Sequence, residues 1–405
     1  MKLLGLMSGT SLDGIDAALL EVEEVPQVRE NATPSLLASL KWELLAFRTR
    51  RFSPDERRAI QETMTSGGAR EMALLHTRLG EWFASAVLEF LAEVGVPPES
   101  VSALGSHGQT IWHEPPRAEV RGASLQMGCP ATLAERTGID VVSDFRSRDL
   151  AAGGHGAPLV PWADRIFFSS PQGPRAIQNL GGMANVTWLP RAADPAPILA
   201  FDTGPGVALL DGAMELATAG AKTFDEGGAL ARQGTVSEGV VGRLLTHPFF
   251  RQAPPRSTGR ELFGSTMLNE IVRELGRETG VELVPGSTLQ GWPDLLATLT
   301  ALTARSIGES YRRWVLPRGV DEVFLMGGGS RNPVLFEAIR DELSPLEVRP
   351  GESLGMDPDA REAAAFALLA WAHLMGIPAN VPEATGSRGP RVLGSLTPGR
   401  REVGP

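Results

Sequence analysis

The chain begins with the hydrophobic and polar pattern of two strands joined by a turn. Apolar runs at residues 3–7 and 15–20 flank the polar segment 8–14, which predicts a β-hairpin. Residues 176–189 repeat this pattern, with apolar runs on either side of Gly181 and Gly182. Two such hairpins in one chain indicate a duplicated α/β fold with one hairpin in each half.

Elsewhere the spacing of apolar residues predicts alternating strands and helices. A long amphipathic helix is expected over 71–95, where apolar residues recur at helical spacing. Further strands are expected at 40–47, 101–105, 138–143, 198–201 and 322–326. Further helices are expected at 131–137, 294–315, 335–343 and 360–374, with one more through 210–216. Residues 24–39 are expected to be a loop, and the Gly/Pro-rich tail after Pro378 irregular structure.

The turn of the first hairpin carries candidate chemistry. Gly9 and Gly14 allow the backbone to turn tightly, and Ser8, Thr10 and Ser11 supply hydroxyl groups. In such a turn, successive backbone N–H groups could bind an anion. Asp13 and Asp16 would repel a bare phosphate and suit a cation such as Mg²⁺ better. The Walker P-loop signature is absent from this turn. A plain hairpin with capping hydroxyls explains the same residues, and the turn alone leaves both interpretations open.

Two further polar clusters follow predicted strands. Residues 106–115 contain His107, Gln109 and His113, and without further ligands at zinc spacing we favour hydrogen bonds to sugar or water over a metal site. Residues 144–149 alternate Asp and Arg before a Gly-rich loop. Arg146 and Arg148 could clamp an anionic group, or the segment could be a solvated ion-pair network.

Asp202 is the strongest catalytic candidate. It is expected at the end of a strand, beside the turn that contains Gly204 and Gly206 and close to a helix N-terminus, where it could act on a ligand near phosphate. An N-cap role is the alternative, disfavoured because the helix body lies too far downstream. The triplet 327–329 between a strand and a helix could cradle a nucleotide, and Glu362 lies near the start of an Ala-rich helix.

Composition narrows the function classes. The 405 residues are 42% hydrophobic and 21% charged, as in an ordinary globular protein with room for two or three domains. The net charge of −10 argues against nucleic acid, and no apolar stretch reaches the ~20 residues of a membrane span. The single cysteine fits a reducing cytoplasm. Lysine occurs only at positions 2, 41 and 222, so backbone N–H groups, a metal and arginine would have to bind any phosphate.

In this order, the motifs resemble those of the anhydro-N-acetylmuramic acid kinases of the actin/hexokinase/Hsp70-like ATPase superfamily. The resemblance covers nearly the whole chain and rests on the segments 7–16, 106–115, 144–161, 179–185, 201–206, 257–261, 327–332 and 362–366. The opening motif followed by Gly-Ala-Pro-Leu-Val-Pro at 156–161 is specific to that family.

The resemblance implies a fold and a reaction. It implies an α/β, two-domain actin-like ATPase (duplicated RNase H-like) fold with a central cleft, divided into 1–138 plus 378–405 and 139–377. It implies a kinase that uses ATP and Mg²⁺ to open 1,6-anhydro-N-acetylmuramic acid hydrolytically and to phosphorylate O6. The expected partner is this small-molecule substrate, with neither nucleic acid nor membrane, in the cytoplasm, and a homodimer is allowed for.

The resemblance also assigns roles. Asp202 would be the general base, and Asp13 and Asp16 would bind the metal. The expected substrate-binding residues are His107, Gln109, Arg146, Arg148 and Glu362. The expected ATP-binding residues are Ser8, Gly9, Thr10, Ser11, Leu12, Asp13, Gly14, Asp16, Gly181, Gly182, Gly204, Gly206, Gly327, Gly328, Gly329 and Asn332.

The chain departs from the family pattern at three positions. His155 replaces Gln, Val207 replaces Asn and Arg256 replaces Lys, and segment 24–36 resembles an insertion. Val207 removes a polar contact beside the expected catalytic loop. Two other functions stay open: another sugar or carboxylate kinase of the superfamily, and a non-catalytic Hsp70-like ATP-binding module. No peptide-binding β-domain follows segment 327–332, which speaks against the module.

Overall fold

A computed structural model describes residues 1–9, 12–23, 33–116, 120–286 and 289–400. It divides into two compact units. The first comprises residues 1–167, 193–197 and 359–405, and the second comprises 168–192 and 198–358. Among the described helices, none combines the length and the apolar character that a membrane crossing requires.

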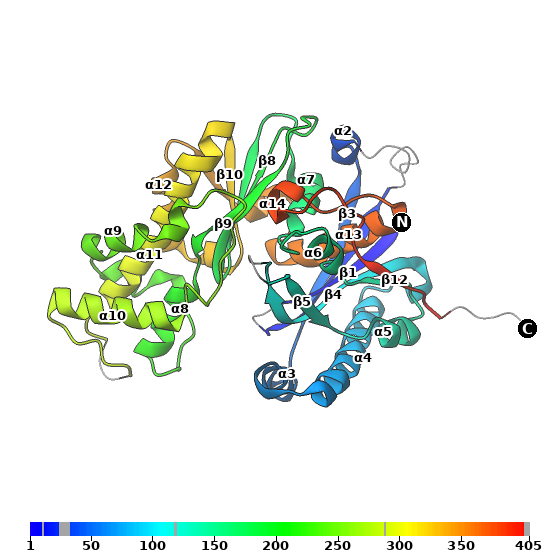
Figure 1. Cartoon of the computed structure of the whole chain (residues 1–405), viewed down its shortest axis with the longest axis horizontal. Helices are drawn as coiled ribbons and strands as arrows, with labels where there is room; N and C mark the ends of the chain where they lie inside the picture. The colour runs from blue at the N-terminus through cyan, green and yellow to red at the C-terminus, as the bar shows by residue number, and fades with distance from the viewer. Residues whose placement is uncertain (10–11, 24–32, 117–119, 287–288, 401–405) are drawn as a thin grey trace, which may run out of the picture. The chain divides into compact units, whose positions relative to one another are not determined.

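The first unit is built on a mixed sheet (Figure 1). Its strands are β1 (Lys2–Ser8), β2 (Gly14–Val22), β3 (Trp42–Arg51), β4 (Val101–Glu114), β5 (Ala123–Met127), β6 (Val141–Ser143) and β12 (Ser395–Thr397). Its helices are α2 (Pro34–Ala38), α3 (Pro54–Ser66), α4 (Ala69–Glu93), α5 (Pro130–Thr137), α6 (Ser147–Ala151), α7 (Val160–Phe168), α13 (Arg361–Met375) and α14 (Pro382–Thr385).

The second unit has a five-stranded sheet. Its strands are β7 (Arg175–Leu180), β8 (Met183–Leu189), β9 (Leu199–Pro205), β10 (Glu322–Met326) and β11 (Glu347–Pro350). Its helices are α8 (Ala208–Ala217), α9 (Glu238–Leu245), α10 (Ser265–Thr279), α11 (Trp292–Ser310) and α12 (Pro333–Leu343). α8 and α11 pack their apolar faces into one core with the sheet.

Both sheets repeat one strand order. In the first unit β1, β2 and β3 form an antiparallel meander, and β4 and then β6 continue the sheet parallel to β1. In the second unit β7, β8 and β9 form the meander, and β10 and then β11 continue it parallel to β7. The same order in both units confirms the predicted duplicated α/β fold with one hairpin per half.

The predicted division of the chain differs from these two units. Residues 139–167, 193–197 and 359–377 belong to the first unit rather than to the second. The physical reason is pairing and packing, since β6 pairs with β4 and α13 packs on β1, β2 and β4.

Several predicted elements need correction. The strand expected at 101–105 continues through the polar cluster to Glu114, because β5 pairs with its second half. The strand expected to end at residue 201 continues as β9 to Pro205, because β8 pairs with it that far. The tail contains α14 and also β12, which pairs with β6. Within the expected loop 24–39, residues 34–38 form α2, and 24–32 lie outside the described part.

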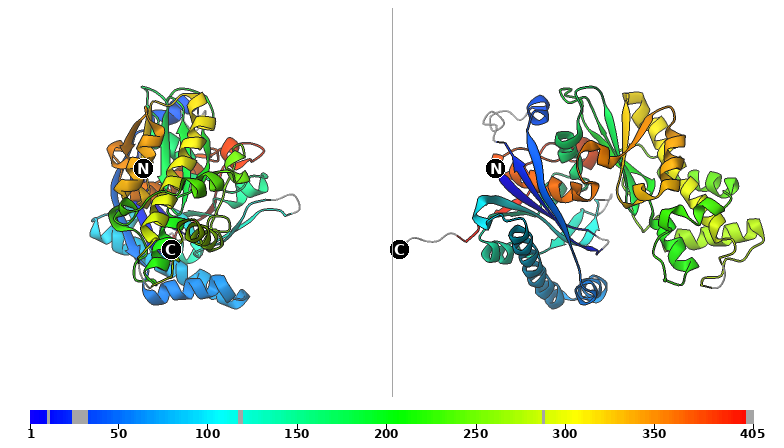
Figure 2. Two further views of the ribbon diagram at one scale, coloured as in Figure 1. Left: turned by 90° about the vertical axis from the view of Figure 1, so that its left-hand side faces the viewer. Right: turned by 180° about the vertical axis from the view of Figure 1, so that it is seen from behind.

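Helices cover both faces of the first sheet. Leu4, Leu6 and Leu104 pack against α4 and α5 in one apolar core, while α13 contacts the opposite face (Figure 2). Gly5 and Gly105 are register partners on β1 and β4. A Cβ atom would lie 1.8 Å from the Ala363 carbonyl oxygen at Gly5 and 2.0 Å from the Phe366 carbonyl oxygen at Gly105. α13 therefore packs directly on the sheet backbone at this pair of glycines.

This close approach makes Gly105 a test of the packing. Gly105→Val should lower the free energy of unfolding by about 3 kcal/mol, because an added side chain must push α13 off the sheet. Urea unfolding followed by circular dichroism would measure it. Gly242→Ala, in α9, is the matched control, since a Cβ there meets no atom within 4 Å. Equal stability of the two variants would contradict the packing described here.

Candidate functional site

The turn of the first hairpin is braced from behind by buried side chains. The Ser8 hydroxyl lies 2.9 Å from the Gly14 carbonyl oxygen and 2.7 Å from Gln109 Oε1. Gln109 Nε2 donates to the Gly9 carbonyl oxygen at 3.1 Å. Leu12 holds a left-handed φ of 57° with its side chain buried in the core. These contacts fix the shape of the turn, while Thr10 and Ser11 lie outside the described residues.

Gln109 was expected to bind the substrate. The structure buries it completely, and its amide nitrogen also donates to the Thr110 carbonyl oxygen at 3.1 Å. These contacts give Gln109 the position of a support for the hairpin turn, and a direct contact with substrate would require them to break.

Asp16 lies among other acidic groups. Burial raises its pKa to about 6, the Thr49 hydroxyl that donates to its Oδ1 at 2.5 Å opposes the rise, and the charges of Glu362, Asp359 and Asp13 add to it. A cation near Asp16 would relieve this repulsion. Nowhere in the described part of the chain do three or more His, Cys, Asp or Glu side chains gather so that they could hold a metal ion. Metal binding by Asp13 and Asp16 therefore stays a prediction.

His107 and Arg146 form a buried pair. The two guanidinium nitrogens Nε and Nη2 lie 3.2 and 2.7 Å from His107 Nε2. Burial, with the Arg146 charge, lowers the pKa of His107 well below its usual range, so the ring is neutral and its proton lies on Nδ1, 2.7 Å from the Gly108 carbonyl oxygen. Burial also lowers the pKa of Arg146 to about 10, which leaves the guanidinium charged at neutral pH.

The alternating Asp and Arg residues have different structural roles. Arg146 Nη1 donates to the Gly156 carbonyl oxygen at 2.8 Å, and Asp149 accepts from the Gly156 N–H at 2.9 Å, so both hold the Gly-rich loop. Asp149 is fully buried and also accepts from Asn380 and Thr385, each at 2.8 Å. Arg148 is exposed and forms no ion pair with any residue that the structure describes.

Glu362 joins these groups from α13. Its side chain is exposed in the first turn of the helix. Its negative charge contributes to the raised pKa of Asp16, and it partly offsets the lowering of the Arg146 pKa by burial. The first unit thus brings together Glu362, Arg146, His107 and Asp16. The arrangement offers hydrogen-bond donors and acceptors beside a carboxylate-rich hairpin.

Asp202 lies in the middle of β9 with a half-buried side chain. Its Oδ2 accepts from the Thr258 backbone N–H at 2.8 Å. Burial raises the pKa of Asp202 to about 7. This hydrogen bond and the Arg256 charge lower the pKa, but by less than burial raises it. The N-cap of α8 is Val207, not Asp202, which excludes the capping alternative. A carboxylate with a pKa near 7 suits a general base.

Arg256 holds the segment that contacts Asp202. It is 5% exposed, and its Nε donates to the Asp202 carbonyl oxygen at 2.9 Å. Its Nη1 donates to the Gln252 carbonyl oxygen at 2.9 Å, and its Nη2 donates to the Ser310 hydroxyl at 2.8 Å. In the sequence, Arg256 is distinguished only by replacing the lysine expected at this position. Nothing in its local sequence indicates these long-range contacts.

Two more polar groups of the second unit were not predicted. The Thr258 hydroxyl is buried and has no hydrogen-bond partner in the described part of the chain. Burial raises the pKa of Asp211, on α8, to about 7, while the Arg260 charge lowers it. The motif at 257–261 was the available signal for Thr258, and the sequence held none for Asp211.

The second hairpin turn lies against the start of α8. The N–H groups of Gly206 and Ala208 donate to the Gly182 carbonyl oxygen at 3.0 and 3.1 Å, and that of Val207 donates to the Gly181 carbonyl oxygen at 2.9 Å. Gly181, Gly182 and Gly206, which lie in two separate sequence motifs, are therefore neighbours in the structure.

The glycine loop after β10 also lies beside this turn. A Cβ on Gly327, whose φ is 81°, would lie 2.6 Å from Asn179 Oδ1. A Cβ on Gly329 would lie 2.7 Å from Val207 Cγ1, so Val207 packs against the loop with an apolar group. Gly328 is exposed, which leaves its backbone open to a ligand.

Asn332 and Gly204 have structural roles of their own, and their part in binding ATP stays a prediction. Asn332 Oδ1 accepts from the Val334 and Leu335 N–H groups at 3.0 and 3.2 Å and caps α12. Gly204, at a φ of 148°, leaves no room for a Cβ, which would lie 2.9 Å from Ser306 Oγ.

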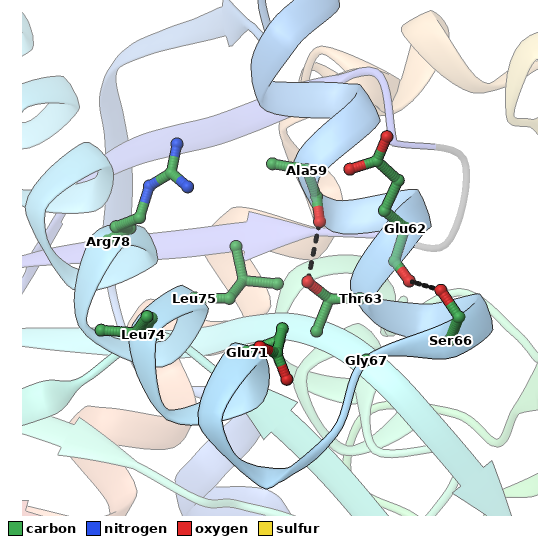
Figure 3. A pocket seen from close by; sticks show the side chains of 9 residues that line it. All are labelled: Ala59, Glu62, Thr63, Ser66, Gly67, Glu71, Leu74, Leu75 and Arg78. Atoms are coloured by element: carbon green, nitrogen blue, oxygen red, sulfur yellow. Dashed lines mark hydrogen bonds between the residues drawn. The ribbon is translucent and has the colours of Figure 1, made fainter.

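A separate cavity of about 520 Å³ lies between α3 and α4 (Figure 3). None of its nine lining residues is a predicted site residue. Thr63 and Ser66 donate their hydroxyls to the Ala59 and Glu62 carbonyl oxygens, at 2.8 and 3.2 Å, within α3. These hydroxyls are thus used inside the helix, and we assign no function to the cavity.

Comparison with known proteins gives consistent results. The profile of a family described as "Anhydro-N-acetylmuramic acid kinase" matches residues 1–399. A protein of that name from Gloeobacter violaceus is 40% identical over 400 residues, covering 98% of both chains. One from Caldanaerobacter subterraneus is 40% identical over 401 residues, covering 97% of this chain and 96% of the other.

Solved structures are less similar. The activator of 2-hydroxyisocaproyl-CoA dehydratase from Clostridium difficile with bound ADPNP has a TM-score of 0.43 and 13% identity, over 92% of this chain and 94% of that one. The fold described above therefore rests on the repeated strand order and not on this likeness.

Proposed function

Because this chain belongs to the anhydro-N-acetylmuramic acid kinase family, we propose that it opens 1,6-anhydro-N-acetylmuramic acid hydrolytically and phosphorylates O6 with ATP. The product would be N-acetylmuramic acid 6-phosphate, in cell-wall recycling. The observation that best supports this chemistry is Asp202, a half-buried carboxylate with a pKa of about 7 held by the Thr258 N–H.

In the proposed reaction, Asp202 takes a proton from water as the water oxygen attacks the anomeric carbon C1. The C1–O6 bond breaks, and O6 keeps its electron pair. O6 then forms a bond to the γ-phosphorus of ATP, and the bond between the γ-phosphorus and the β–γ bridging oxygen breaks to release ADP. The proton remains on Asp202 until it is lost to solvent. Ring opening itself creates the nucleophile, so no separate base for O6 is needed.

Each unit contributes a set of residues to this proposal. The second unit supplies Asp202 and backbone N–H groups of its two glycine turns for nucleotide. The first unit supplies the turn at 8–14 for phosphate, and His107, Arg146, Arg148 and Glu362 for the sugar.

Mg²⁺ fits the acidic side of the first hairpin. Asp13 and Asp16 offer carboxylate oxygens, the ligands that Mg²⁺ prefers. Burial is the main cause of the raised pKa of Asp16, and the nearby acidic charges add to it, which supports a cation at this position. When bound, Mg²⁺ would offset charge on the phosphates. We also propose a cytoplasmic location, which the single cysteine fits, and no nucleic-acid partner, given the net charge of −10. No membrane partner is proposed, and a homodimer is compatible with the proposal.

Incubation with ATP and a panel of sugars tests the function. We expect ADP and a phosphorylated sugar from the anhydro-sugar alone. Turnover on an intact reducing sugar would indicate a different kinase, and ATP turnover without phosphorylated sugar would indicate a binding module.

Arg148 provides a test of substrate binding. Arg148→Ala should raise KM for the anhydro-sugar about tenfold or more, the cost of one charged hydrogen bond, and leave KM for ATP nearly unchanged. Arg70→Ala, an exposed arginine of α4, is the matched control. Equal rises in both KM values for Arg148→Ala would mean that Arg148 does not bind the sugar.

A further inference from the structure

Two asparagines lie beside Asp202 on the same face of the second sheet. Asn179 on β7 is the register partner of Asn185 on β8, and Asn185 is the register partner of Asp202 on β9. Register partners on antiparallel strands point to the same face, with Cβ atoms about 5 Å apart. Asn179, Asn185 and Asp202 therefore form a polar row across the strands β7, β8 and β9, of which β8 and β9 are labelled in Figure 1.

The row faces away from the apolar core of the second unit. The residues next to it in sequence, Leu180, Ala184, Val186 and Phe201, all pack into the core formed with α8 and α11. Because strand side chains alternate between faces, the row must lie on the other face. All three of its side chains are half-buried.

The two amides are not used for internal structure. Within the part of the chain that the structure describes, neither amide side chain forms a hydrogen bond, although each has two donors and an acceptor. The backbone beneath them is fixed from behind, since the buried Gln178 donates to the carbonyl oxygens of Asn179 and Asn185 at 3.3 and 3.0 Å. A fixed backbone therefore presents two amide side chains that are available to bind a ligand or a water molecule.

The two ends of the row lie beside different parts of the proposed site. Asn179 lies beside Gly327 of the loop proposed to bind nucleotide, and Asp202 is the proposed base. Since strands lie about 4.8 Å apart, the row spans about 10 Å. Asn185 occupies the middle position, about 5 Å from the base.

We propose that Asn185 positions the attacking water for Asp202. This inference rests on the proposed function. The water donates one hydrogen to Asp202 and the other to Asn185 Oδ1, which leaves an oxygen lone pair to attack C1. Asn185 forms and breaks no covalent bond, and the proton that leaves the water still goes to Asp202.

Two substitutions of Asn185 test this role. Asn185→Ala should lower kcat about 10²-fold, the cost of a misplaced reactant, with little change in KM for ATP. Asn185→Asp keeps the shape and adds a negative charge about 5 Å from Asp202, which should shift the acidic limb of the kcat/KM profile upward by about one pH unit.

The matched control is Asn269→Asp. Asn269 is exposed on α10, so the same charge is added to the same unit without a neighbour in the row. Its pH profile should overlay that of the unaltered protein. Thermal unfolding would identify any variant that loses activity through its fold.

These experiments distinguish a failure of the proposed function from a failure of the role proposed for Asn185. If the unaltered protein does not convert the anhydro-sugar, the proposed function fails. If it does convert the sugar, but Asn185→Ala keeps its kcat and Asn185→Asp keeps its pH profile, only the role of Asn185 is overturned.

Discussion

Asp202→Asn should lower kcat by about 10²–10⁴-fold and slow ring opening and phosphoryl transfer to the same extent. Asparagine keeps the size and one hydrogen-bond acceptor for the Thr258 N–H, but it cannot take a proton from water. The two steps should fail together because O6 becomes a nucleophile only as the ring opens. ATP affinity, measured by calorimetry, should hardly change, since Asp202 acts on the water at the sugar.

The raised pKa of Asp202 adds a pH dependence. A base acts in its ionised form, and burial raises the pKa of this carboxyl to about 7. The value of kcat/KM should therefore be highest above pH 7 and fall about tenfold per pH unit below it. The profile of initial rates between pH 5 and 9 would measure this limb.

Asp211 gives a control for the same prediction. Burial raises its pKa to about 7 as well, but it lies on α8 and is not the proposed base. Asp211→Asn should keep most of the activity and the acidic limb. An active Asp202→Asn enzyme, or loss of the limb in Asp211→Asn, would assign the base to another residue.

Arg361→Ala should lower the free energy of unfolding by about 3–5 kcal/mol, the largest stability effect that we expect. Arg361 is 5% exposed and Asp164 0%. They form a bidentate pair, with Nε–Oδ1 and Nη2–Oδ2 distances of 2.8 and 2.5 Å. Removing the guanidinium leaves the Asp164 carboxylate buried without its counter-charge. Chemical unfolding would measure the loss.

An exposed ion pair supplies the matched control. Arg136 pairs with Glu81 in the same unit, and both side chains are more than two-fifths exposed. Arg136→Ala should cost no more than about 1 kcal/mol. The double variant Asp164→Leu/Arg361→Met should recover much of the stability lost in Arg361→Ala, because it removes both charges. Equal costs for Arg361→Ala and Arg136→Ala would contradict this account of the pair.

Local sequence predicted the two hairpins and six of the thirteen α-helices in the described part of the chain, because their signals are local; the six are α4, α5, α8, α11, α12 and α13. The strand patterns around 8–14 and around Gly181 and Gly182 each appear as a hairpin. The predicted strand at 322–326 corresponds to β10, whose length is set by a short apolar run between turns.

Long-range contacts explain what the sequence did not disclose. β4 and β9 continue through polar residues because the neighbouring strands β5 and β8 pair with them, and the apolar pattern of a single strand does not show where such pairing ends. The structural role of Asp149 depends on Asn380 and Thr385, more than two hundred residues away. In the same way, alternation within β8 could not show that Asn185 lies opposite Asp202, because that requires the register of two strands.

The most direct test of the coupled reaction is to run it in H₂¹⁸O and fragment the sugar product by mass spectrometry. Quenching at short times limits exchange of the anomeric oxygen with solvent. The proposal predicts N-acetylmuramic acid 6-phosphate with ¹⁸O at C1 and unlabelled oxygen in the ester bond at O6. Label in the ester oxygen would mean that water, and not O6, accepted the phosphoryl group, and would contradict the mechanism.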